Sequence, residues 1–64
     1  MDNNIIELME QMENEFIGAC RDSVKFVDGN NSAGTRVRKY MQNIKNLAQQ
    51  VRVEVQEQKH AVVA

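Results

Sequence analysis

The sequence predicts an all-α protein, an antiparallel two-helix hairpin that dimerises into a four-helix bundle. Three observations support this fold class. The chain of 64 residues has no proline and few aromatic residues. It is rich in Gln, Glu, Met, Lys and Arg, which favour helix over strand. Apolar residues recur at steps of three and four in both halves, and the polar segment DGNNSAGT separates the halves.

The first helix is expected over residues 3–28. Asn3 or Asn4 can serve as its N-cap, because either side chain can accept a hydrogen bond from an N–H of the first turn. Glu7 lies in that first turn, where a negative charge suits the positive end of the helix dipole. The apolar stripe of this helix consists of Ile5, Met9, Met12, Phe16, Ala19 or Cys20, Val24 and Val27.

The turn is expected over residues 28–33 and the second helix over residues 34–60. Ser32 or Thr35 is predicted to lie near the N-cap of the second helix, because both hydroxyl side chains suit that position. The second stripe consists of Val37, Tyr40 or Met41, Ile44, Leu47 or Ala48, Val51 and Val55. We therefore predict a single helical-hairpin domain over residues 1–64.

Both apolar stripes are wider than a single two-helix seam covers, which predicts self-association. The flanking apolar residues are Ile6, Leu8, Ile17, Met41 and Ala48. A chain this short buries only about 60% of the surface of its unfolded form. Its one cysteine and one histidine provide neither an intrachain disulfide nor a zinc site of familiar spacing. A symmetric dimer would bury the surplus apolar surface.

The two halves of the chain carry opposite charge. Residues 1–32 hold seven acidic and two basic residues, a formal charge of −5, and residues 33–64 hold six basic and two acidic residues, a formal charge of +4. A basic row, spaced by seven along the second helix, consists of Arg38, Lys45, Arg52 and Lys59. This row either pairs with Glu15 and Asp22 of the facing helix or presents positive charge to a polyanion.

The start of the second helix is a candidate phosphate site. Backbone N–H groups around Gly34, Thr35 and Arg36 are expected to lie free at the positive end of the helix dipole. Arg36 and Lys39 lie off the basic row and have no obvious acidic partner nearby in sequence. The alternative is that the polar residues here only cap the helix. The candidate nucleic-acid-binding residues are Thr35, Arg36, Arg38, Lys39, Lys45 and Arg52.

The segment GNNSAGTRVRKYMQNIKNLAQQVRVEVQE resembles the core of the small bacterial linker-histone-like proteins. The matching residues are Gly29, Asn30, Ala33, Gly34, Thr35, Arg36, Arg38, Lys39, Leu47 and Arg52. The resemblance implies a DNA-associated, nucleoid-type protein. The better-known members carry a long C-terminal tail rich in Lys and Ala, whereas this sequence ends in EQKHAVVA. We therefore expect its DNA contacts to come from the turn and the second helix.

Two functions remain open. In the first, a homodimer contacts the DNA backbone without sequence preference. In the second, a helical adaptor or assembly protein uses its oppositely charged helices to meet a protein partner, without binding nucleic acid. We expect no enzyme, metal or cofactor site, because the single His and the single Cys form no pair of nucleophile and base. No apolar run is long enough to cross a bilayer, and the acidic N-terminal segment does not resemble a signal peptide. These features predict a cytoplasmic protein.

Overall fold

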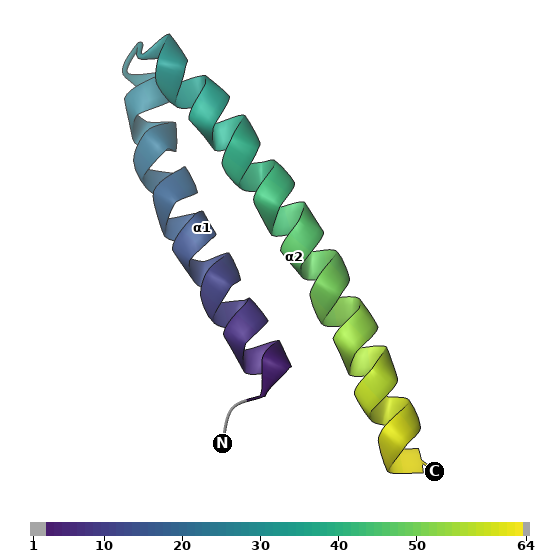
Figure 1. Ribbon diagram of the computed structural model, residues 1–64. Coiled ribbons are helices and arrows are strands. Elements are labelled where there is room, and N and C mark those ends of the chain that lie inside the picture. The colour runs from purple at the N-terminus through teal and green to yellow at the C-terminus, as the bar shows by residue number, and fades with distance from the viewer. Residues whose placement is uncertain (1–2, 64) are drawn as a thin grey trace.

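The computed structural model describes residues 3–63, with side chains for residues 3–60. It is a hairpin of two helices, α1 (Asn4–Val27) and α2 (Asn31–Val63), and the described residues contain no strand. The helices run antiparallel and side by side, and α2 extends past the start of α1 (Figure 1). The molecule is a rod of 54 × 20 × 11 Å. The predicted all-α hairpin is therefore confirmed.

Asn3 begins α1. Its side-chain Oδ1 accepts a hydrogen bond from the N–H of Ile5 at 2.8 Å, and its backbone carbonyl accepts one from the N–H of Glu7 at 3.1 Å. Of the two predicted caps, Asn3 is thus the correct one, and Asn4 is the first helical residue. The side-chain amides of Asn3 and Gln58 also face each other at 3.4 Å, which joins the two helices at the open end of the hairpin.

The turn consists of Asp28, Gly29 and Asn30. The N–H of Gly29 donates to the carbonyl of Phe26 at 2.9 Å. The N–H of Asn30 donates to the carbonyl of Lys25 at 3.0 Å. These two bonds form a Schellman motif, in which the C′ residue adopts a left-handed conformation. Gly29 has a φ of 109°, which a residue without Cβ adopts at little cost.

Asn30 also begins α2. Its Oδ1 accepts a hydrogen bond from the N–H of Ala33 at 3.2 Å, and its carbonyl accepts from the same N–H at 3.1 Å. The predicted caps, Ser32 and Thr35, were wrong. Asn30 follows the turn glycine directly and is as good an N-cap as a serine, so α2 starts at Asn31, earlier than expected.

The two helices meet along a seam with alternating steps of three and four. On α1 the seam residues are Ile5, Leu8, Met12, Glu15, Ala19 and Asp22, and on α2 they are Ala33, Val37, Tyr40, Ile44, Leu47 and Val51. This is the spacing of a coiled-coil interface. Four apolar members of the seam, Leu8, Ala19, Ala33 and Leu47, are buried, and they form the core of the hairpin.

The seam of α1 differs from the predicted stripe. Leu8, expected to flank the stripe, is 5% exposed, whereas Met9 and Phe16 are 51% and 58% exposed. Val24 and Val27 are exposed as well. Two seam positions of α1 are occupied by carboxylates, so hydrophobicity alone pointed to the neighbouring face of the helix. The observed seam follows the strict seven-residue repeat rather than the centre of the apolar face.

Two glycines allow the helices to approach each other closely. A Cβ placed at Gly18 would lie 2.5 Å from Cζ of Tyr40. A Cβ placed at Gly34 would lie 2.7 Å from the ring of Phe26. Each glycine therefore accommodates an aromatic ring from the other helix. Of the two residues predicted for the second stripe at this level, Tyr40 belongs to the seam, and Met41 stays 44% exposed.

Candidate nucleic-acid interface

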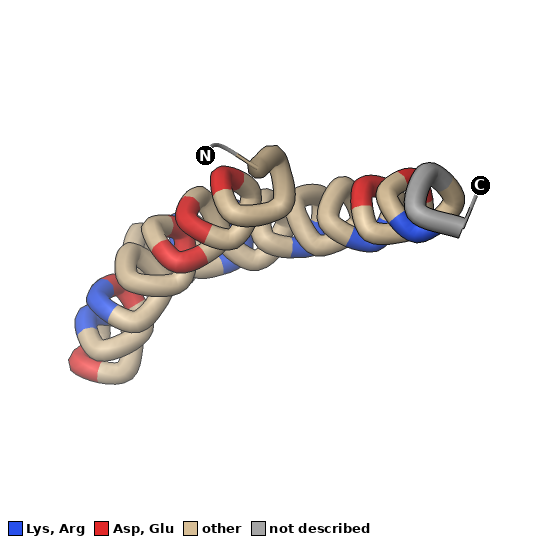
Figure 2. Tube along the Cα trace, turned by 90° about the horizontal axis from the view of Figure 1, so that it is seen from below, with Lys and Arg blue, Asp and Glu red and all other residues tan. Residues whose placement is uncertain are grey.

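Basic residues follow the outer side of α2. In Figure 2 several Lys and Arg positions of α2 lie along one edge of its tube, whereas most Asp and Glu positions gather on α1. The exposed basic residues of α2 are Arg36, Arg38, Lys39, Lys45, Arg52 and Lys59. From Asn31 to Val53, α2 contains no acidic residue. The positive potential along this part of the helix is therefore not interrupted by a negative side chain of its own.

The basic row has no ion pair among the described side chains. Within residues 3–60, the one salt bridge joins Arg36 to Asp22. Glu15 accepts a hydrogen bond at 3.1 Å from Nδ2 of Asn43, so neither predicted acidic partner meets the row. The interpretation that the row holds the hairpin in register was therefore wrong. Within residues 3–60, the side chains of the row are exposed and make no ion pair in the hairpin.

Arg36 is engaged inside the hairpin. Its Nη2 lies 3.1 Å from Oδ1 of Asp22, whose side chain is 8% exposed. The hydrogen bond from Arg36 lowers the pKa of Asp22 below its ordinary value, against the opposing effect of burial. The same hydrogen bond raises the pKa of Arg36. Folding thus supplies the acidic partner that the local sequence of Arg36 lacks, and this contact gives Arg36 a structural role.

The candidate residues lie on different sides of α2. Successive residues of an α-helix are about 100° apart, so Arg36 and Arg38 project about 160° apart. Arg36 and Lys39 line a groove together with Glu15, Tyr40 and Asn43. Arg38 and Thr35 line another groove, next to Phe26 and Val37. The structure therefore does not gather the six predicted residues into one cluster. Arg38 and Thr35 belong with the basic row, and Arg36 belongs with the polar contacts between the helices.

The backbone part of the predicted phosphate site is not formed as expected. Because α2 begins at Asn31, Thr35 and Arg36 lie beyond the first four residues, whose N–H groups are those that an α-helix leaves without an acceptor. Among those first four residues, Ala33 already donates to Asn30. Phosphate contacts by Thr35 and Arg36 would therefore come from their side chains.

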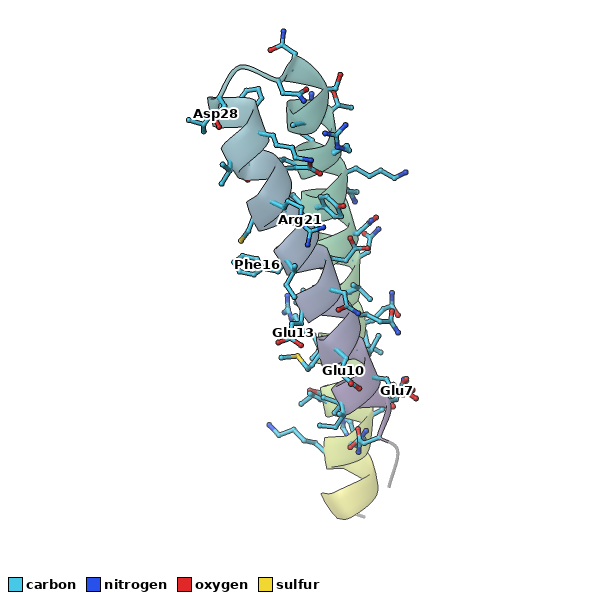
Figure 3. The ribbon with its side chains drawn as sticks, turned by 90° about the vertical axis from the view of Figure 1, so that its left-hand side faces the viewer. Glu7, Glu10, Glu13, Phe16, Arg21 and Asp28 are labelled. Atoms are coloured by element: carbon cyan, nitrogen blue, oxygen red, sulfur yellow. The ribbon has the colours of Figure 1, made fainter. Side chains whose placement is uncertain are left out.

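The side of the seam opposite the contacts of Asp22 with Arg36 and of Glu15 with Asn43 is apolar. We call it the apolar side, and it is formed by Met9, Phe16, Cys20, Met41, Ile44 and Val55. A groove on this side is lined by Met9, Met12, Glu13, Phe16 and Ile44. Figure 3 shows Phe16 and Glu13 projecting from the same side of α1, whereas Glu7 projects from the other. The sequence indicated a surplus of apolar surface, and the structure shows which residues expose it.

Among residues 3–63, no group of His, Cys, Asp and Glu side chains is placed to hold a metal ion. Over the same part of the chain, neither helix has an apolar stretch that could span a membrane.

Comparison with known proteins identifies one family. The family model described as histone H1-like protein Hc1 matches residues 6–61. No curated protein and no solved structure gives a significant match. The matched range covers the turn, nearly all of both helices and every candidate basic residue. The match confirms the resemblance of the second half of the chain and extends it to α1.

Proposed function

We propose that the chain, which belongs to the histone H1-like protein Hc1 family, binds the DNA backbone without sequence preference along the outer side of α2. One observation carries the proposal. From Asn31 to Val53 the helix has no acidic residue, and Arg38 and Arg52 stay exposed and without an ion pair among the described side chains. A DNA-bound protein of this kind would act at the nucleoid.

The spacing of the two arginines suits a duplex. Arg38 and Arg52 are separated by 14 residues, which is about 21 Å along a helix. That distance corresponds to about six steps of the DNA backbone. Each guanidinium can present two parallel N–H donors to one phosphate. Lys39 adds a charge near the turn, and the hydroxyl of Thr35 adds a donor next to Arg38. Lys45 lies between the arginines on the same row but borders the apolar side.

We include self-association in the proposal. About three phosphate contacts per chain give weak binding at physiological salt, and a dimer carries the basic row twice. The exposed apolar side supports this step, because Phe16 and Met9 keep more than half of their surface in water in the single chain. The same apolar side also supports the second candidate function, a helical adaptor that meets another protein and binds no nucleic acid.

Titration of a duplex with two double variants tests the DNA-binding proposal. Arg38→Gln with Arg52→Gln removes two charges from the basic row, and we expect the slope of log K against log salt to fall by about two. The matched control, Arg21→Gln with Lys25→Gln, removes two exposed charges from α1 and should leave the slope nearly unchanged. Thermal melting verifies that both variants fold.

The two variants also separate the proposal from its alternatives. An equal loss of binding in both would show that overall charge, and not the basic row, governs the affinity. Absence of binding by the unmodified chain even at low salt would contradict the DNA-binding function and support the helical adaptor.

A further inference from the structure

The apolar side is a strip shared by both helices. On α1 it contains Met9 and Phe16, spaced by seven residues, and both line the groove that Ile44 of α2 borders. On α2 it includes Met41 and Val55, which are 44% and 38% exposed. Residues that recur every seven positions lie on one side of a helix. The strip therefore runs along the rod rather than forming a single local patch.

Two residues of opposite charge, Glu13 and Lys45, border this strip at the same height along the rod. The hydrogen bond between Glu15 and Asn43 sets the register of the antiparallel helices. Two residues before Glu15 on α1 is Glu13, and two residues after Asn43 on α2 is Lys45, so these two lie level with each other. Glu13 lines the groove of the apolar side and projects with Phe16 (Figure 3). Lys45 follows Ile44 and lies about 100° farther outward around α2.

We infer that two copies pair through their apolar sides with both turns at the same end, so that α1 of each copy lies over α2 of the other. This inference rests on the self-association proposed above and specifies its geometry. A two-fold axis along the rod then brings Glu13 of each copy to Lys45 of the other, because these two residues lie at the same height along the rod. The apolar strips meet between these two symmetric ion pairs.

Charge selects this arrangement over the reversed one. If the turns lay at opposite ends, α1 would face α1 and α2 would face α2. The basic row of one copy would then border the basic row of the other, and Glu13 would have no basic partner. Like charges across a helix interface are unfavourable and determine the orientation in which helices pair. The acidic α1 and the basic α2 thus favour the arrangement with both turns at one end.

The arrangement assigns different roles to members of the basic row. Lys45 meets the second copy at the edge of the interface. Arg38 and Arg52 lie on the same row as Lys45, level with Cys20 and Ile6 of α1, and neither of these residues is acidic. The dimer therefore leaves both arginines of each copy available for phosphate, and their removal affects DNA binding more than dimerisation.

Charge reversal tests the ion pair. We expect Glu13→Lys and Lys45→Glu each to raise the dimer Kd by about tenfold, because each reverses two symmetric rim pairs. The double variant should restore the original Kd. Glu10→Lys is the matched control, since it makes the same charge change on an exposed position of α1 that lies on the front of the helix in Figure 3 and not on the side of Phe16. Sedimentation velocity over a range of concentrations measures all four variants.

Distance measurement tests the orientation. A spin label at Ser32→Cys, with Cys20→Ser, reports the separation of the two turns by pulsed electron paramagnetic resonance. Turns at the same end predict a separation below about 25 Å, because helices in a bundle lie 8–10 Å apart. The reversed arrangement centred near Phe16 predicts about 33 Å or more, twice the length of helix from Phe16 to Val27.

The outcomes distinguish the inference from the proposal on which it rests. A dimer with a long distance between the labels, or without rescue in the double charge variant, would overturn the arrangement and leave self-association standing. A chain that stays monomeric at every concentration would overturn self-association itself. The titration with duplex DNA is independent of both results.

Discussion

The two long sides of the hairpin differ in how many of their side chains find a partner within one chain. On the side of Asp22 and Arg36, polar groups meet partners across the seam: the ion pair lies at 3.1 Å, and Glu15 accepts from Asn43 at 3.1 Å. Among the described residues, no buried side-chain nitrogen or oxygen lacks a hydrogen-bond partner. On the apolar side, Phe16 is 58% exposed. One chain completes its polar contacts but not its apolar ones.

This difference separates the contacts that form the hairpin from those available to a partner. The seam uses small and polar residues, with glycine facing an aromatic ring at two levels. The larger apolar side chains lie beside the seam. Burial of such a side chain contributes about 1.5–3 kcal/mol, which is available to an assembly but not to the single hairpin. Substitutions on the two sides should therefore affect different measurements.

The largest effect is expected on the apolar side. Phe16→Ala should raise the dimer Kd by at least about a hundredfold, because two copies of the ring lose their burial. The melting of the single chain should change little, since the ring is already 58% exposed there. Val53→Ala is the control, because Val53 is 46% exposed and lines a separate groove with Asn4 and Glu57. Light scattering measures both; an equal effect of the two substitutions would contradict the comparison.

A smaller effect is expected inside the seam. Gly18→Ala should lower the free energy of unfolding by about 1–2 kcal/mol, because overpacking against Tyr40 outweighs the gain of about 1 kcal/mol in helix propensity. Gly34→Ala is the matched control. Its neighbour Phe26 is 50% exposed and can turn outward, so the substitution should be near neutral. Urea unfolding compares the two. Equal stabilities would show that the seam tolerates a methyl group at both levels.

The smallest effect is expected on the polar side. The pKa of Asp22 is lowered in the folded chain, so its ionised form stabilises the fold at pH values above its unfolded pKa. This stabilisation is lost as the pH falls through the lowered pKa. Asp22→Asn should lower the melting temperature at pH 7, and the difference from the unmodified chain should shrink toward pH about 3.

Asp28→Asn is the control for this pH dependence, because Asp28 is exposed in the turn. Melting curves at both pH values for the three proteins test the ion pair. A melting difference between Asp22→Asn and the unmodified chain that is the same at both pH values would contradict a role of the charged pair.

The parts of the fold that depend on a local sequence pattern, such as a helical spacing or a turn segment, could be predicted from the sequence. The seven-residue spacing of α2 predicted Val37, Ile44 and Val51 in the seam, and the polar segment around Gly29 predicted the turn. The seam of α1 was predicted only in part, because Ile5, Met12 and Ala19 lie in it whereas the other members of the predicted stripe are exposed. A stripe of hydrophobicity does not distinguish the surface that packs within one chain from the surface left for a partner.

The candidate site was predictable in its composition but not in its contacts. The spacing of Arg38, Lys45 and Arg52 by seven residues predicted that they share one row on the helix. The pairing of Arg36 with Asp22 depends on the register between the helices, which the Schellman turn and the cap at Asn30 set together. Sequence spacing along one helix contains no information about that register.

Binding of the phosphate backbone by α2 is tested by a titration of a short duplex with the unmodified chain between about 50 and 200 mM salt. We expect binding at low salt that weakens steeply, with a slope of about −3 for each bound chain if Arg38, Lys39 and Arg52 each neutralise one phosphate. No binding at the lowest salt concentration, or binding that does not depend on salt, would contradict it.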